Sequence, residues 1–278
     1  MLYLLLAILC SALVSVLMRV SSDKVTGNVS MLAMNYVMCL VLAVAFTGEG
    51  GAVAGTPGVS TAVFLGIING VLYLLGFVLL QFNVKKNGVV LSATFMKLGL
   101  LVPMVVSVCF FGEQPALWQV VGFILAVAAI LLVNAGNDGT ATGMKAGLIL
   151  LLLVNGGADA MSKIFEELGE VKWSECFLLV TFGTALLLCG ALVFVQRERP
   201  GKWEVLFGLL IGIPNYFSAR FLLRALERVA AVIVYPTYSV ATILAVTVAG
   251  LCLFHERLAK RQWFAVAAIL VALVLLNI

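Results

Sequence analysis

Charge is scarce in this chain of 278 residues, since only 11% are Asp, Glu, Lys or Arg, whereas 63% are hydrophobic. A typical soluble domain has about 25% charged and about 45–50% apolar residues. The chain therefore carries more apolar surface than a water-soluble core can bury, and the excess must face lipid. Its net charge of +4 comes without a basic stripe interleaved with aromatic residues, so we expect no nucleic-acid partner.

Histidine is scarce as well, and the cysteines are not clustered. The single histidine, His255, lies in a basic turn, and the six cysteines lie in or beside apolar runs without CxxC or Cys/His spacing. This pattern disfavours zinc sites and disulfide bonds, and we expect no cofactor. The chain has no GxxxxGK[ST] phosphate-binding run, so nothing indicates ATP hydrolysis. Without a converging nucleophile, base or metal ligands, a membrane enzyme is only a remote alternative.

Ten apolar segments approach the length of about 20 residues that a membrane-spanning helix needs. The first five are Leu2–Met18, Ser30–Phe46, Thr61–Phe82, Val89–Phe111 and Trp118–Val133. The second five are Ala146–Ser162, Ser174–Val195, Val205–Leu223, Ala231–Phe254 and Trp263–Asn277. The first segment lacks a basic region before it and a clear cleavage site, so we expect a membrane helix rather than a signal peptide. The sequence predicts an all-α integral membrane protein.

The two halves of the chain repeat one another. At an offset of 143, Phe111, Glu113 and Gln119 correspond to Phe254, Glu256 and Gln262. At an offset of 142, the GxxxG pair Gly66 and Gly70 corresponds to Gly208 and Gly212, and this spacing lets helix backbones approach closely. Because each half has five helices, an odd number, the second half is expected to be inverted in the membrane. Inverted repeats are typical of carriers that open alternately to each side.

These features resemble the EamA-like branch of the drug/metabolite transporter superfamily. The resemblance rests on two Phe-x-Glu turns, Phe111-Gly112-Glu113 and Phe254-His255-Glu256, each followed by an Ala/Leu/Val helix that ends in Asn. It implies a ten-helix secondary carrier with two EamA-like five-helix repeats, residues 1–143 and 144–278. The first, third and fourth helices of each half would line its central cavity. We expect Glu113 and Glu256 to cap the helices that follow them, because a helix N-terminus favours negative charge.

Basic residues between the predicted helices are distributed unevenly between the two sides of the membrane. Eleven fall on the side of Arg19 and Lys24, and four, Lys163, Lys172, Arg224 and Arg228, fall on the other. The positive-inside rule places the larger group in the cytoplasm and both termini outside. We expect a multi-pass protein of the plasma membrane, such as a bacterial inner membrane, present as a monomer or homodimer.

Three ionisable residues stand out within the predicted helices, namely Lys97, Asp159 and Arg220. Such residues cost about 2.5–3.5 kcal/mol each at the bilayer centre and are functional candidates by default. Lys97 is expected to contact an anionic part of a substrate, or else to pair with a buried acid. Asp159 shares a helix face with Asn155 and is expected to bind a coupling proton or cation or to neutralise Lys97, unless it faces water at a helix end. Arg220 follows Tyr216 by one turn and either binds substrate or extends to the interface.

Prolines interrupt three predicted helices, at Pro103, Pro214 and Pro236, and are expected to kink them. Tyr235 and Tyr238 flank Pro236 and either line the cavity or pack between helices. The expected substrate-binding residues are Lys97, Asn155, Asp159, Asn215, Tyr216, Arg220, Tyr235 and Tyr238.

The sequence favours a secondary active transporter that exports a small polar metabolite, such as an amino acid or another carboxylate compound, by alternating access. Two alternatives in the same superfamily stay open, a phosphate or nucleotide-sugar exchanger and an exporter of cationic drugs. Small four-helix drug exporters of that superfamily carry a glutamate in the first helix. Leu2–Met18 has no acid, which disfavours that alternative.

Overall fold

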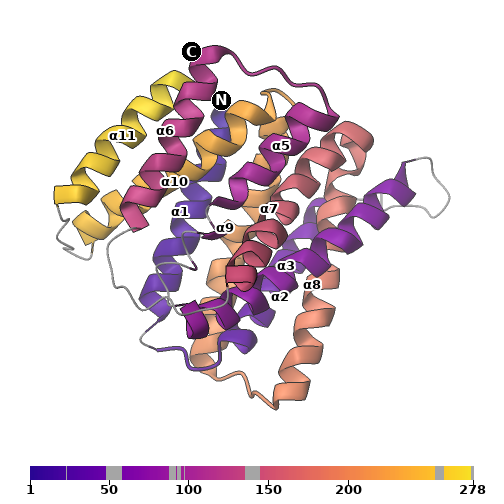
Figure 1. The fold of residues 1–278 in the computed structure, drawn as a ribbon. Coiled ribbons are helices and arrows are strands. Elements are labelled where there is room, and N and C mark those ends of the chain that lie inside the picture. The colour runs from indigo at the N-terminus through magenta and orange to yellow at the C-terminus, as the bar shows by residue number, and fades with distance from the viewer. Residues whose placement is uncertain are drawn as a thin grey trace. The chain divides into compact units, whose positions relative to one another are not determined.

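The computed structural model describes residues 1–22, 24–47, 58–87, 92, 95–96, 98–134, 145–253 and 260–276. All regular elements in these ranges are helices (Figure 1). They are α1 (Leu2–Ser21), α2 (Asn28–Thr47), α3 (Val59–Asn87), the 3-10 turn η1 (Leu98–Leu100), α5 (Leu101–Phe110), α6 (Leu117–Asn134), α7 (Lys145–Leu168), the 3-10 turn η2 (Val171–Trp173), α8 (Ser174–Gln196), α9 (Lys202–Leu226), α10 (Ala231–Leu253) and α11 (Lys260–Leu276).

Seven of the described helices are long and apolar enough to cross a membrane. Two shorter apolar helices, Leu98–Phe110 and Leu117–Ala128, accompany them. The helical, multi-pass character expected from the sequence is therefore confirmed. The arrangement of ten helices as inverted repeats stays a prediction.

The expected fourth helix, Val89–Phe111, is not one regular α-helix in its described part. A 3-10 turn covers Leu98–Leu100, and the α-helix starts anew at Leu101. Pro103 explains the break, because proline has no N–H to donate to the carbonyl of Gly99 and is tolerated in the first turn of a helix. Lys97, the cation expected in this helix, lies outside the described residues.

The described helices form two compact units. Unit 1 contains Met1–Leu74 and Ile164–Glu227, and unit 2 contains Leu75–Lys163 and Arg228–Ile278. Each unit takes segments from both halves of the sequence. The compact units therefore differ from the two expected repeats, residues 1–143 and 144–278. The repeat boundary stays a prediction about how the sequence was duplicated.

In unit 1, α9 packs against α1 and α2, and α8 packs against α2. The GxxxG pairs make two of its helix crossings close. A Cβ atom at Gly212 of α9 would lie 2.6 Å from the carbonyl oxygen of Asn35 on α2, and one at Gly70 of α3 would lie 2.6 Å from that of Thr181 on α8. The close approach predicted for both pairs is confirmed. Each glycine-bearing helix contacts a helix from the other half of the sequence.

In unit 2, α6 packs against α11, and α10 packs against α5, α6 and α11. Buried Leu98, Leu100, Ala126, Val240 and Ala272 form a core among these elements. The helix α7 stays continuous through Gly156. A Cβ atom there would lie against the carbonyl oxygen of Gly99, so this glycine permits close contact between backbones.

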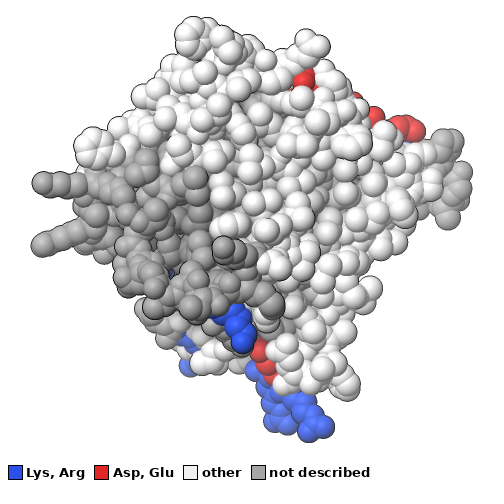
Figure 2. Space-filling model, viewed as in Figure 1, with Lys and Arg blue, Asp and Glu red and all other residues white. Residues whose placement is uncertain are grey.

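On the face shown in Figure 2, the described residues carry few charges, and these lie toward its edges, as expected for helices that face lipid. Lys and Arg atoms gather at its lower edge, over the connection between α8 and α9. The exposed basic residues there are Arg197 and Arg199 of the connection and Lys202, the first residue of α9. They belong to the larger basic group that the positive-inside rule assigns to the cytoplasm.

Candidate functional site

Arg220 forms an ion pair within unit 1. Its Nε–H donates to Oε1 of Glu175 at 2.7 Å, and the two side chains are 22% and 15% exposed. Glu175 lies in the first turn of α8, where the helix macrodipole favours a negative charge. Both residues belong to helices that can cross a membrane, so the pair places two partly accessible charges among the predominantly apolar helices of unit 1.

Tyr216 joins the same carboxylate. Its hydroxyl donates to Oε2 of Glu175 at 2.8 Å, and its side chain is completely buried. Tyr216 and Arg220 are one turn apart on α9, so their side chains leave the same helix face. Glu175 is therefore held from both oxygens by α9.

An aromatic side chain covers the guanidinium. The central carbon of Arg220 lies 4.1 Å from the ring centroid of Phe46, near the end of α2. The same ring stacks on Tyr216 at 5.9 Å and meets Phe217 edge-on at 5.7 Å. Cation–π attraction favours this placement of an arginine and fixes the plane of its donor groups.

A second polar cluster lies deeper in unit 1, at the crossing of α2 and α9. Asn215 Nδ2 donates to Asn35 Oδ1 at 3.2 Å and to Cys39 Sγ at 3.7 Å. The Cys39 thiol donates to the carbonyl oxygen of Gly212 at 3.4 Å. Asn35 is only 4% exposed, so these bonds satisfy polar groups that water cannot reach.

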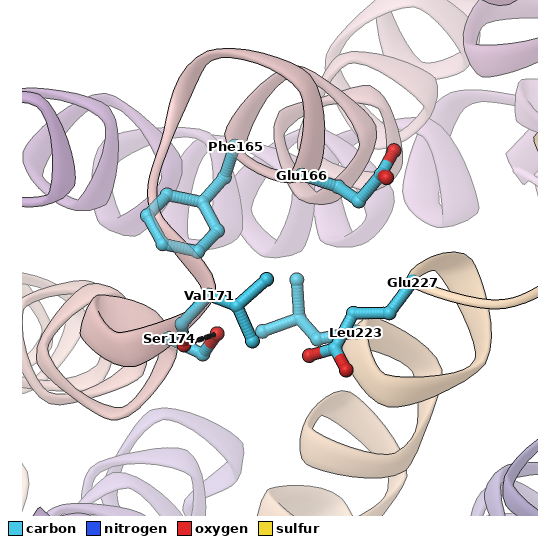
Figure 3. A pocket seen from close by; sticks show the side chains of 6 residues that line it. All are labelled: Phe165, Glu166, Val171, Ser174, Leu223 and Glu227. Atoms are coloured by element: carbon cyan, nitrogen blue, oxygen red, sulfur yellow. Dashed lines mark hydrogen bonds between the residues drawn. The ribbon is translucent and has the colours of Figure 1, made fainter.

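A small cavity lies among α7, η2, α8 and α9 in unit 1 (Figure 3). Figure 3 shows Leu223 and the carboxylate of Glu227 opposite Phe165 and Val171. Ser174 Oγ donates to the carbonyl oxygen of Val171 at 2.6 Å. The cavity volume of about 10 Å³ is room for a single water molecule. It is too small to be a metabolite chamber.

The expected residues of unit 2 lie on α7 and α10. The Tyr235 hydroxyl donates to the backbone carbonyl of Asp159 at 2.7 Å, while Asp159 itself is exposed. Asn155 Nδ2 donates to the carbonyl oxygen of Leu151 in its own helix at 3.1 Å. Tyr238 is half-buried on α10.

Glu113 caps a helix other than the one expected. Its carboxylate oxygens accept the backbone N–H groups of Ala231 and Val232, each at 3.0 Å, at the start of α10 rather than of α6. Its Oε1 also lies 3.0 Å from Nζ of Lys163. The N-terminus of α6 is capped instead by Gln119, whose Oε1 accepts the backbone N–H of Ala116 at 3.0 Å. Glu256, the corresponding acid, lies outside the described residues.

The physical reason for this correction lies in the sequence before α10. The preceding residues are Arg228-Val229-Ala230, and their side chains offer no acceptor for the unbonded N–H groups of a first turn. An acid from another part of the chain supplies the acceptors.

The expected site residues fall into both units. Asn215, Tyr216 and Arg220 lie in unit 1, and Asn155, Asp159, Tyr235 and Tyr238 lie in unit 2. Sequence reasoning missed the partners Glu175, Phe46 and Asn35, and placed Lys163 only among the flanking basic residues. One signal was available, because Glu175 is the single acid of the predicted segment Ser174–Val195, and a membrane-embedded arginine requires a counter-charge.

Known proteins resemble this chain in fold or in part of their sequence. One solved crystal structure superposes with a TM-score of 0.78 at 16% sequence identity, covering 99% of this chain and 98% of that one, a likeness of fold alone. A protein of Haemophilus influenzae, described only as uncharacterized, is 24% identical over 273 residues, or 95% of this chain and 93% of that protein.

A third similarity is to the probable 4-amino-4-deoxy-L-arabinose-phosphoundecaprenol flippase subunit ArnE of Serratia proteamaculans. That protein is 34% identical over 84 residues, which are 30% of this chain and 69% of ArnE. The sequence model of the EamA-like transporter family matches residues 1–135 and, separately, 146–278. The resemblance seen in the two Phe-x-Glu turns is thus confirmed, and the chain belongs to the EamA-like transporter family of membrane proteins.

Proposed function

We propose that this protein is a secondary active transporter that exports a small metabolite bearing both a carboxylate and an amine, such as an amino acid. Family membership supports transport. The Arg220–Glu175 pair supports the substrate class, because it holds one cation and one anion side by side in a partly accessible part of the bundle.

The chemistry of the pair fits a zwitterion. A guanidinium carries N–H donors on all three nitrogens, and its terminal nitrogens match the geometry of a carboxylate. Arg220 directs its Nε–H at Glu175. A substrate carboxylate would bind the arginine, and a substrate ammonium would bind Glu175 together with Tyr216. One ion pair would then be replaced by two, which compensates the cost of removing a charged substrate from water.

Transport would follow the alternating access of an inverted-repeat carrier. The reciprocal glycine crossings of unit 1 support duplication, because each joins helices from opposite halves of the sequence. Asp159, exposed on α7, is our candidate for binding a coupling proton. Lys97, which lies outside the described residues, stays our candidate from the sequence for a cation that contacts an anionic part of the substrate.

Counterflow into proteoliposomes tests the substrate class. Vesicles loaded with a mixture of unlabelled amino acids should accumulate the corresponding radiolabelled amino acid. Arg220→Met should reduce the initial rate at least about tenfold, the factor that corresponds to one lost charge-assisted hydrogen bond. Lys172→Met is the matched control, because it breaks an exposed ion pair with Glu170 whose side chains are 59% and 46% exposed. Exchange of sugar phosphates or organic cations without exchange of any amino acid would contradict the proposal.

Similarity to ArnE favours a second candidate, the flipping of a lipid-linked amino sugar phosphate. Such a headgroup also carries an amine and an anion. Unit 2 has a wholly apolar groove of about 220 Å³, lined by residues that include Met104, Val108 and Phe123, where a lipid chain could rest. Proteoliposomes with a fluorescent short-chain polyprenyl phosphate that carries an amino sugar distinguish the candidates. Protein-dependent loss of protection from external dithionite would support flipping, and full retention of protection would exclude it.

A further inference from the structure

Two of the passages between the compact units lie close to Glu113 and its partners. The chain leaves unit 2 after Lys163 of α7 and returns to it at Arg228, just before α10. Glu113 contacts Lys163 itself and the N–H groups of Ala231 and Val232. One carboxylate thus holds both chain segments inside unit 2.

The same two helices are joined again one turn further on. Tyr235 follows Ala231 by four residues on α10, and its hydroxyl donates to the carbonyl oxygen of Asp159. Asp159 precedes Lys163 by four residues on α7, so both lie on one helix face. Two successive turns of α7 are therefore fastened to two successive turns of α10.

The contacts of Glu113 are largely shielded from solvent, and two of them are hydrogen bonds from backbone N–H groups. The Lys163 side chain is only 5% exposed and that of Glu113 only 14%, and the ammonium also lies 5.8 Å from the ring centroid of Phe111. A buried ion pair resists opening because either charge left alone would be costly. Opening the contact also requires breaking the two backbone hydrogen bonds to Glu113, which leaves N–H groups in the first turn of α10 without acceptors.

We propose that Glu113 is a positioning residue that clamps α7 to α10 within unit 2, and so sets how readily these two helices separate during transport. The clamp touches no substrate, and it acts through the helices it holds. Its effect on transport rests on the proposed carrier function, whereas its effect on α10 does not.

Hydrogen exchange followed by mass spectrometry tests the clamp without a substrate. In purified full-length protein, Glu113→Ala should speed exchange at the first turn of α10 by about tenfold or more, since each lost bond to the carboxylate is charge-assisted. Glu113→Gln keeps one acceptor oxygen but loses the charge, and should fall between wild type and Glu113→Ala. Unchanged exchange in both variants would overturn the proposal, whatever the protein transports.

Transport kinetics test the positioning role. In amino-acid counterflow, Glu113→Gln should change the maximal rate by about tenfold while the half-saturating concentration stays within about twofold of wild type. Glu113→Asp, which keeps the charge, should recover part of that change, and Lys172→Met should match wild type. A shift in half-saturation alone, or faster exchange at α10 with unaltered maximal rate, would overturn the role. If wild type moves no amino acid, the proposed function fails, and hydrogen exchange alone decides the clamp.

Discussion

The Arg220–Glu175 pair of unit 1 and the Lys163–Glu113 pair of unit 2 use the same two kinds of charge but are held differently. In unit 1 the acid is held by side chains, those of Arg220 and Tyr216. In unit 2 the acid also accepts two backbone N–H groups at a helix start. A pair held by side chains can exchange partners with a ligand when rotamers change. A pair that also caps a helix can open only if the helix end changes too.

The two pairs also differ in how exposed their cations are. The cation of unit 1 is 22% exposed, whereas that of unit 2 is 5% exposed. The deeper cation should therefore contribute more to stability when its partner is removed, and the shallower pair should contribute more to ligand exchange. We therefore predict a structural role for the Lys163–Glu113 pair and a binding role for the Arg220–Glu175 pair.

Removing the buried cation should have the largest effect on stability. Lys163→Met leaves the carboxylate of Glu113 without its ammonium in a shielded place, and we expect a loss of about 3–5 kcal/mol in the free energy of unfolding. Unfolding by SDS titration in mixed micelles measures it. Lys172→Met should lose less than about 1 kcal/mol, because its pair with Glu170 is exposed. Equal losses of stability in Lys163→Met and Lys172→Met would show that burial of the Lys163–Glu113 pair does not matter for stability.

Adding a methyl group at the glycine crossings should come next. Gly212→Ala would place a Cβ atom 2.5 Å from Cβ of Met38, and Gly70→Ala would place one 2.6 Å from Cβ of Thr184. Overpacking of this kind costs about 1–3 kcal/mol. Gly190→Ala on α8 is the control, because nothing lies within 4 Å of its added Cβ. If only one crossing is sensitive, the two halves do not contribute equally to unit 1.

Neutralising the acid of unit 1 should affect transport more than stability. Glu175→Gln keeps an acceptor for Tyr216, and its partly exposed position predicts a stability loss of about 1–2 kcal/mol, between the limits for exposed and buried pairs. Counterflow of amino acids should fall at least about tenfold. Paired SDS titration and counterflow on one preparation measure both quantities. Full transport by a destabilised variant would assign Glu175 a structural role.

The smallest effect is expected at the neutral polar cluster. Asn35→Ala removes the acceptor of the 3.2 Å bond from Asn215, and interhelical hydrogen bonds in membrane proteins contribute about 0.6 kcal/mol on average. SDS titration should resolve this loss from that of Glu175→Gln. A loss above about 2 kcal/mol would show that the asparagines, rather than the glycines, hold α2 against α9.

Local pattern was enough to predict the helical segments and the two close crossings, but not the break before Leu101 in the expected fourth helix. Apolar runs of the right length mark the spans, and a GxxxG spacing allows close approach whatever its partner helix is. The pairing of charges was beyond local pattern, because Arg220 and Glu175 are 45 residues apart and Glu113 reaches an N–H group 118 residues away. Such partners are set by how the helices pack. Lys163 illustrates the limit, since near a predicted helix end it resembles a flanking residue, yet it is buried.

The length of α3 ties the protein to the membrane around it. The helix has 29 residues without a proline and passes from unit 1 into unit 2 at Leu74. At 1.5 Å per residue it is about 43 Å long, against a hydrocarbon core of about 30 Å. The excess must be absorbed by tilt or by emergence into the headgroups. Bilayer thickness therefore acts on a helix that belongs to both units, and we expect its tilt to change when the protein is reconstituted in lipids of different chain length.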